Sequence, residues 1–363
     1  MTFSKVASAL VLGFVTFFSL ASNAESLAIS SAGSPDTASA RQQNISIGIF
    51  NPGIPSDTSL HRQLGVFPEV RGVEARLLPF VLREILMESD QWGAVRVVPS
   101  VSPGDEILVS GLIKKSDGET LEVQMSAVDA FGREWVNGLY SMESGTNDPN
   151  NPVEISTSFK NVFIRFSNDL LAARDTYSEL QLGRNREVAL LRYASKLLPD
   201  FYSQHIQSNA EGLFEIARLP ASDDPMLERI RRIREFEYLF IDQIDEQYQS
   251  LYLEVSQTYN LWLRYQERLT RYRLEGEQQR RNSVKGSRGS FNAMRESYEH
   301  YKWLKMEEQN LRKWALGFSN EVDPTVVEVE GRVVRLDGSL EQRYDEWSEI
   351  LRSILRAESE ANN

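Results

Sequence analysis

A cationic run lies between Arg264 and Arg288 of this sequence. Eight Arg and Lys side chains stand there against three Glu side chains, so the net charge of the run is +5. Such a cluster can contact anionic lipid headgroups or an acidic partner. A solvated helix face that only aids solubility explains the same charges. The candidate contact residues are Arg271, Arg273, Arg280, Arg281, Lys285 and Arg288.

Motifs for catalysis or metal binding are missing from the sequence. It has no G-x-S-x-G, no H-E-x-x-H and no phosphate-cradling glycine loop. His61, His205 and His300 are far apart and lack the spacing of metal ligands, so each is interpreted as a structural or surface residue. The absence of Cys removes thiol nucleophiles, thiolate metal sites and redox motifs. We therefore predict no catalytic residue, no cofactor and no metal.

Carboxylate pairs are inevitable among 52 acidic residues, so none is taken as an acid–base pair. Asp224, with Asp223 before it, precedes a helical pattern and is interpreted as a helix cap. The group Asp242, Asp245 and Glu246 is interpreted as a solvated helix face. Asp129 precedes Phe131-Gly132, where a turn residue is expected.

Composition places the chain among ordinary globular proteins. It has 363 residues, of which 41% are hydrophobic and 25% charged, and this length suggests two domains. The net charge of −12 opposes binding to phosphate backbones, so no nucleic-acid partner is expected.

The amino terminus has the layout of a secretory signal. Lys5 precedes an uncharged apolar stretch, and Ser22-Asn23-Ala24 fits a cleavage site, so residues 1–24 are predicted to be a signal peptide. Residues 25–43 are rich in Ala, Ser and Gly and predict a flexible linker. Export without Cys favours the periplasm of a Gram-negative bacterium, with association to the outer membrane also open.

Residues 44–176 alternate between strand and helix patterns. Strands are expected at 45–49, 95–97, 106–115, 121–126 and 134–142, and helices at 73–87 and from Asn151 onward. Pro79 inside the first helix predicts a kink or a later start. On the strand from Leu121, the apolar residues alternate with Glu122, Gln124 and Ser126, so one face of this strand is expected to be wet.

One stretch of this region resembles known envelope proteins. Asp105-Glu106-Ile107-Leu108-Val109-Ser110-Gly111, Leu121-Glu122-Val123 and Val128-Asp129-Ala130-Phe131-Gly132-Arg133 follow a strand, Gly, strand, Asp-x-x-Gly order. This pattern is similar to the TolB amino-terminal domain, the curli secretion channel family and the outer-membrane activators of penicillin-binding proteins. The resemblance implies a small α/β domain and, by analogy of fold, a partner-binding role in envelope assembly.

The rest of the chain has a helical pattern. Helices are expected at 179–198, 201–219 and from Pro225, and two heptad seams around a turn at 285–290 predict a long antiparallel hairpin. Two short β segments, 325–329 and 332–336, and a last helix follow. The expected units are thus an α/β domain at 44–176, a helical bundle at 177–320, and a β-hairpin with a helix at 321–363.

The fold class expected is α+β, with a mostly antiparallel sheet and two helices before an elongated helical bundle. The expected function is a non-enzymatic interaction or assembly module of the cell envelope, with an envelope protein as partner and possible peripheral contact with an anionic membrane surface. An envelope hydrolase with an unrecognised site and a structural spacer across the periplasm are the alternatives. The sequence does not set the oligomeric state.

Overall fold

The computed structural model describes residues 41–64, 66–117, 120–143, 155–221, 223–244, 259–260, 295, 298, 302, 306, 309, 325–329, 332–336 and 340–361. The expected signal peptide, the linker up to residue 40 and the turn of the expected hairpin lie outside these residues. Within the described ranges, no helix has the length and apolarity needed to cross a membrane.

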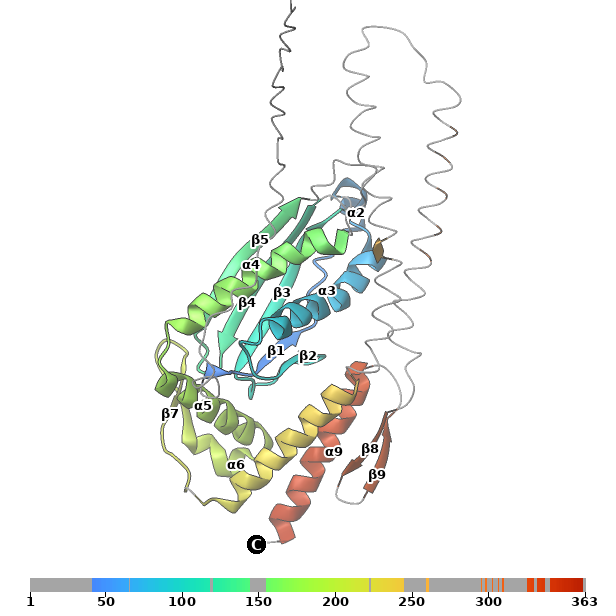
Figure 1. The fold of residues 1–363 in the computed structure, drawn as a ribbon. Helices are drawn as coiled ribbons and strands as arrows, with labels where there is room; N and C mark the ends of the chain where they lie inside the picture. Colours follow the sequence, from blue (N-terminus) through green and yellow to red (C-terminus); the bar gives the residue numbers. More distant parts are fainter. Residues whose placement is uncertain are drawn as a thin grey trace, which may run out of the picture.

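A five-stranded sheet forms the centre of the amino-terminal half (Figure 1). Its strands are β1 (Ile45–Gly48), β2 (Val95–Val98), β3 (Ile107–Ser116), β4 (Thr120–Asp129) and β5 (Glu134–Glu143), in the order β2-β1-β3-β4-β5. β1 pairs in parallel with both β2 and β3, whereas β3, β4 and β5 form an antiparallel meander. The expectation of a mostly antiparallel sheet is therefore wrong: the sheet is mixed, because a helical crossover returns the chain from β1 to β2 in the same direction.

The side chains of β4 alternate between buried and part-exposed along the whole strand, so the expected wet face is confirmed. The buried set includes Leu121, Val123 and Met125, each with no exposed surface. On the opposite face, Ser110 and Lys114 of β3 are exposed, and Leu139 of β5 is 56% exposed. The antiparallel part of the sheet thus has one open face.

Two long helices cover the other face, α3 (Pro68–Glu88) and α4 (Ile155–Asp175) (Figure 1). α3 begins at Pro68, earlier than the expected residue 73, and continues through Pro79. The proline at the first turn is compatible with helix entry, since its missing N–H would have had no partner there. A short helix that the pattern did not predict, α2 (Thr58–Leu64), precedes α3. The rings of Phe50 and Phe163 meet in the core beneath α4, with centroids 6.5 Å apart.

α5 (Glu179–Leu197) follows α4 after a short turn and agrees with the helix predicted at 179–198. Its first turn is closed by a capping box, in which the Ser178 hydroxyl accepts from the Gln181 N–H and the Gln181 side chain accepts from the Ser178 N–H. Helix α5 therefore starts at a position that the sequence itself specifies.

The helix expected at 201–219 is wrong. After α6 (Pro199–Tyr202) and a single 3₁₀ turn, the chain forms a small hairpin of β6 (Ile206–Ser208) and β7 (Phe214–Ile216). The Asn209 side chain accepts from the N–H groups of Glu211 and Leu213, and Gly212 has φ +81°. This turn chemistry overrides the helical spacing of the apolar residues, because Gly reaches the left-handed region without strain.

Two more helices pack together in the second half. Residues 225–244 are helical, and α9 (Leu340–Ala361) lies beside them (Figure 1). The rings of Phe240 and Trp347 stack with centroids 5.5 Å apart. The strands β8 (Thr325–Val329) and β9 (Arg332–Leu336) form the predicted carboxyl-terminal hairpin, which is confirmed. The expected last helix is also confirmed, and Tyr344, Trp347, Leu351 and Ile354 on one of its faces are buried.

The fold class as a whole needs correction. The long helical hairpin and its elongated bundle are not shown, since residues 245–258 and 261–294 lie outside the described part. What the structure contains is a mixed sheet with helices on one face, followed by helices whose apolar side chains belong to the same buried cluster as the sheet. The buried apolar cluster thus continues across the change in pattern near residue 177, and the division into separate units stays a prediction.

A buried polar cluster joins the two halves. Arg234 of the helix at 225–244 donates to Asp105, at 2.9 Å, and to Glu237, at 2.8 Å. Asp105 also accepts from the Ser46 hydroxyl of β1, and Glu237 accepts from the Tyr344 hydroxyl of α9. All five side chains are buried. Every charge in the cluster therefore has an opposite charge or a hydrogen-bond donor beside it, as burial requires.

Candidate partner-binding surface

The turn between β4 and β5 is organised by Asp129. One carboxylate oxygen accepts from the backbone N–H of Arg133, at 2.9 Å. The other accepts from Arg133 Nε, at 2.8 Å, and from Trp135 Nε1, at 3.0 Å. Gly132 supplies the left-handed residue of the turn, with φ +87°. The interpretation of Asp129 as a turn residue is therefore confirmed, and its side chain also fixes the directions of Arg133 and Trp135.

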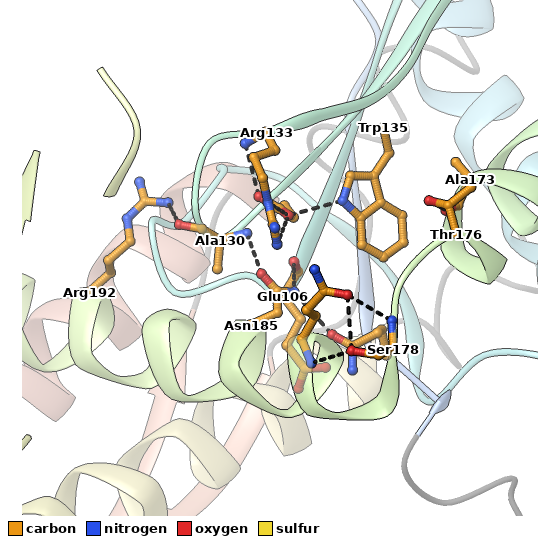
Figure 2. Close-up of polar contacts among 12 residues, drawn as sticks. Glu106, Ala130, Arg133, Trp135, Ala173, Thr176, Ser178, Asn185 and Arg192 are labelled. Atoms are coloured by element: carbon orange, nitrogen blue, oxygen red, sulfur yellow. Dashed lines mark hydrogen bonds and ion pairs between the residues drawn. The ribbon is translucent and has the colours of Figure 1, made fainter. Parts of the chain in front are cut away.

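Side chains of helix α5, which lies below this turn in Figure 2, form hydrogen bonds with its backbone. The Ala130 N–H donates to Asn185 Oδ1, at 3.0 Å, and its carbonyl accepts from Arg192 Nη1, at 2.7 Å. Asn185 Nδ2 in turn donates to the Glu106 carbonyl, at 2.7 Å. Phe131 is held from another side, since its carbonyl accepts from the Phe214 N–H of β7. Because α5 and β7 both hold its backbone, the turn is a rigid platform for its side chains.

The turn displays a ladder of part-exposed aromatic and cationic groups. Trp135 stacks on Tyr177, with ring centroids 4.9 Å apart and an interplanar angle of 19°. The Arg133 guanidinium lies 4.9 Å from the Tyr177 ring centroid and 4.3 Å from that of Phe131. We call these four residues, Phe131, Arg133, Trp135 and Tyr177, the aromatic ladder. Trp, Tyr, Phe and Arg are the side chains most enriched at protein–protein interfaces.

Two hollows continue from the ladder along α5. The first, of about 540 Å³, lies between Phe131, α5 and β7 and has Arg184 and Arg218 on its walls. The second, of about 270 Å³, is lined mainly by apolar side chains of α5 and of residues 219–227. Glu187 and Leu219 line both, so the two hollows are adjacent. We call the two together the α5 groove.

Three buried carboxyl groups in the described part of the chain have raised pKa values, and each is hydrogen-bonded within the protein. Burial raises the pKa of Glu106, against the opposing effects of the Asn44 N–H and Arg186. Burial likewise raises the pKa of Asp105 and of Glu74, which accepts from the hydroxyls of Ser116 and Tyr259. None of these three carboxyls lines either hollow. Their raised pKa values thus follow from their position in the core, away from the groove.

The residues singled out from the sequence lie elsewhere. The cationic cluster Arg271, Arg273, Arg280, Arg281, Lys285 and Arg288 falls outside the described residues, so its contact with an anionic surface or a partner stays a prediction. His300 also lies outside them, whereas His61 donates to the Pro55 carbonyl and His205 to that of Arg218, each at 2.7 Å. Within the described ranges, no group of His, Asp and Glu has the arrangement of a metal site.

The expected capping role of Asp224 is confirmed, since its side chain accepts from the N–H groups of Met226 and Leu227. Asp242 is exposed, as expected of a solvated helix face, and it also has a partner. It forms a two-pronged ion pair with Arg96 of β2, with N–O distances of 2.7 and 2.9 Å, which ties the helix at 225–244 to the sheet. Asp245 and Glu246 lie outside the described residues.

The aromatic ladder was not recognised from the sequence, although part of its signal was present. The alternation of β5 places Trp135 on the wet face, and a large aromatic side chain on a solvent-facing strand surface is a signal of a contact site. Tyr177 gave no such signal, because it reaches Trp135 only through the turn between α4 and α5. Comparison with protein-family models, with curated proteins and with solved structures finds no match.

Proposed function

We propose that this chain is an exported, non-catalytic protein of the bacterial cell envelope that works by binding a protein partner. The aromatic ladder carries this proposal. Its four side chains are part-exposed, belong to the residue types that dominate binding energy at interfaces, and stand on a backbone that is already fixed. A prearranged surface loses little conformational entropy on binding, so more of its contact energy appears as affinity.

The surrounding chemistry favours binding over catalysis. The buried carboxyls with raised pKa values are paired within the core and none lines the α5 groove. The two His residues in the described part hold backbone carbonyls. A hydrolytic site would instead need a nucleophile or an activated water beside a base that the substrate can reach. An assembly role in the envelope also agrees with the resemblance of residues 45–175 to envelope-assembly domains, which remains a resemblance of pattern.

Photo-crosslinking in the periplasm tests this function. A photoreactive phenylalanine analogue at Phe131 should give a specific adduct with one envelope protein. The matched control is the same analogue at Met87, which is 52% exposed at the end of α3 and distant in sequence from the ladder. Arg133→Ala should weaken the adduct, since truncating an interface hot spot costs about 2 kcal/mol or more of binding free energy.

Thermal unfolding of purified Arg133→Ala separates binding from folding. We expect a measurable loss of stability, because Arg133→Ala removes cation–π contacts worth roughly 0.5–1 kcal/mol and also the ion pair with the buried Asp129 carboxylate, so adducts are compared below the unfolding transition of the variant. The proposed function fails if Phe131 and Met87 give the same adducts, or if no adduct forms at Phe131 in the exported protein.

A further inference from the structure

In the buried cluster around Arg234, two carboxyl groups share one guanidinium. Arg234 Nη2 donates to Asp105 Oδ1, at 2.9 Å, and Arg234 Nη1 donates to Glu237 Oε2, at 2.8 Å. The three side chains are only 9%, 4% and 4% exposed, in the order Arg234, Asp105 and Glu237. With both carboxyls ionised, these three groups have a net charge of −1 away from water. Burial of an unbalanced charge is costly, so this geometry favours a proton on one of the two carboxyls.

The two carboxyls belong to different halves of the molecule. Asp105 lies in the loop between β2 and β3 and accepts from the Ser46 hydroxyl of β1, at 2.8 Å. Glu237 lies on the helix at 225–244 and accepts from the Tyr344 hydroxyl of α9, at 2.6 Å. Their shared guanidinium therefore connects the sheet to these two carboxyl-terminal helices. A proton taken up here changes the strength of that connection.

Other ionisable groups also act on the Asp105 carboxyl. Arg192 of α5 attracts it, whereas Glu237 repels it. Three phenols pack around the cluster: Tyr193 of α5, Tyr238 of the helix at 225–244, and Tyr344 of α9. Burial raises the pKa of each phenol, so all three stay neutral over the pH range in which carboxyls titrate. The charge of the cluster thus changes through its carboxyls.

The direction of this change follows from the position of Asp105. Burial raises the pKa of Asp105 above its ordinary value of 3.8, while the attraction of Arg234 opposes the shift. The hydrogen bonds from Ser46 and from the Ser102 N–H, at 3.0 Å, oppose it too. A carboxyl with a higher pKa in the folded state contributes stability that is fully present below the unfolded pKa. This contribution is lost as pH rises through the folded pKa.

We propose that this cluster is an acid-tightened joint between the sheet and the carboxyl-terminal helices. A proton on Asp105 removes the excess negative charge, so Arg234 and Glu237 remain as a balanced pair. As pH rises, Asp105 loses its proton, two carboxylates share one guanidinium, and the joint weakens. The joint needs no partner, so this inference is independent of the proposed partner-binding function.

Urea unfolding of the full chain between pH 4 and pH 8 tests the joint. Asp105→Asn is the main variant, because the amide has the shape of a neutral carboxyl and cannot ionise. Relative to this variant, the unfolding equilibrium constant of the wild type should rise with pH by up to about tenfold per pH unit. The rise is confined to the window between the ordinary and the raised pKa of Asp105. The matched control is Asp345→Asn at an exposed position of α9, which should follow the wild type.

Glu237→Gln tests whether the guanidinium is shared. Without the charge of Glu237, Arg234 pairs with Asp105 alone, so the window should move to lower pH. The inference is overturned if Asp105→Asn keeps the pH dependence of the wild type. It is equally overturned if Glu237→Gln leaves the window where it was.

Carbon-13 NMR of the wild-type chain gives a readout that does not depend on the folding of any variant. Labelling the aspartate carboxyl carbons separates Asp105 from Glu74 and Glu106, whose pKa values burial also raises. One aspartate resonance of the folded protein should titrate with a midpoint above 3.8 and return to the ordinary midpoint in urea. If every aspartate of the folded protein titrates at or below 3.8, the joint holds no proton and the inference is wrong.

Discussion

At the scale of single residues, the buried cluster around Arg234 should contribute more to the stability of the fold than any ion pair on the surface. Its guanidinium is buried between Asp105 and Glu237 and also lies 4.4 Å from the Tyr193 ring centroid. Exposed ion pairs contribute roughly 0–1 kcal/mol to stability. Breaking a buried pair by removing one partner costs about 3–5 kcal/mol, because the remaining charge has no solvation.

Arg234→Met should therefore destabilise the protein by roughly 3–5 kcal/mol, with a loss that grows with pH. Burial already raises the pKa of Asp105 in the folded state, and the attraction of Arg234 opposes that shift. Without Arg234 the folded pKa rises further, and stability falls as pH rises from the unfolded pKa through the folded one. Urea unfolding at pH 5 and pH 8 measures this. An equal loss at both pH values would show that Asp105 keeps its charge by another route.

At the scale of elements, two glycines test whether backbone conformation positions the ladder. Gly132 has φ +87°, so Gly132→Ala should cost about 1–2 kcal/mol and also shift Phe131 and Arg133. Gly183 lies inside α5 with open space around its Cα, so Gly183→Ala should instead stabilise by roughly 0.5–1 kcal/mol. Thermal unfolding measures the change in stability for each variant, so the same substitution is compared in a left-handed turn and inside a helix. If both variants changed stability equally, the turn at Gly132 would accept a side chain without strain.

The sequence predicts most of the helices and strands, but less of how the strands pair and how the elements pack. Alternation along β4 and the cap at Ser178 are local signals, so β4 and α5 lie where they were expected. The parallel pairing of β1 depends on a crossover, which no local pattern encodes. The helix predicted at 201–219 failed because the turn residues Asn209 and Gly212 outweigh apolar spacing.

The candidate site depends still more on tertiary structure. The contact of Trp135 with Tyr177 joins a strand to the junction of two helices, and the α5 groove joins α5 to a hairpin that was predicted to be helix. Only the turn at Asp129 could be expected from adjacent residues. The sequence therefore predicts the turn at this site, but not which side chains the fold places around the turn.

At the scale of the whole molecule, the buried apolar cluster crosses the boundary at residue 177. It extends from Ile47 and Val109 of the sheet, through Tyr193 of α5, to Phe240 and Trp347 in the carboxyl-terminal helices. The Arg96–Asp242 pair and the Arg234 cluster cross the same boundary. Elements that share one core should unfold together, since opening either half exposes apolar surface of the other.

Trp347→Ala tests this cooperativity from one end of the chain. Trp347 has no exposed surface, so its truncation should cost about 3–5 kcal/mol. Native-state hydrogen exchange should then show an equal loss of protection in β3, β4 and α9, because all three open only on global unfolding. Trp347→Phe is the matched control: it keeps a ring against Phe240 and removes an indole N–H that has no acceptor among the described residues, so its loss should be smaller. If α9 lost protection while β3 and β4 kept theirs, the two halves would be separate folding units, and the change in sequence pattern near residue 177 would mark a true domain boundary.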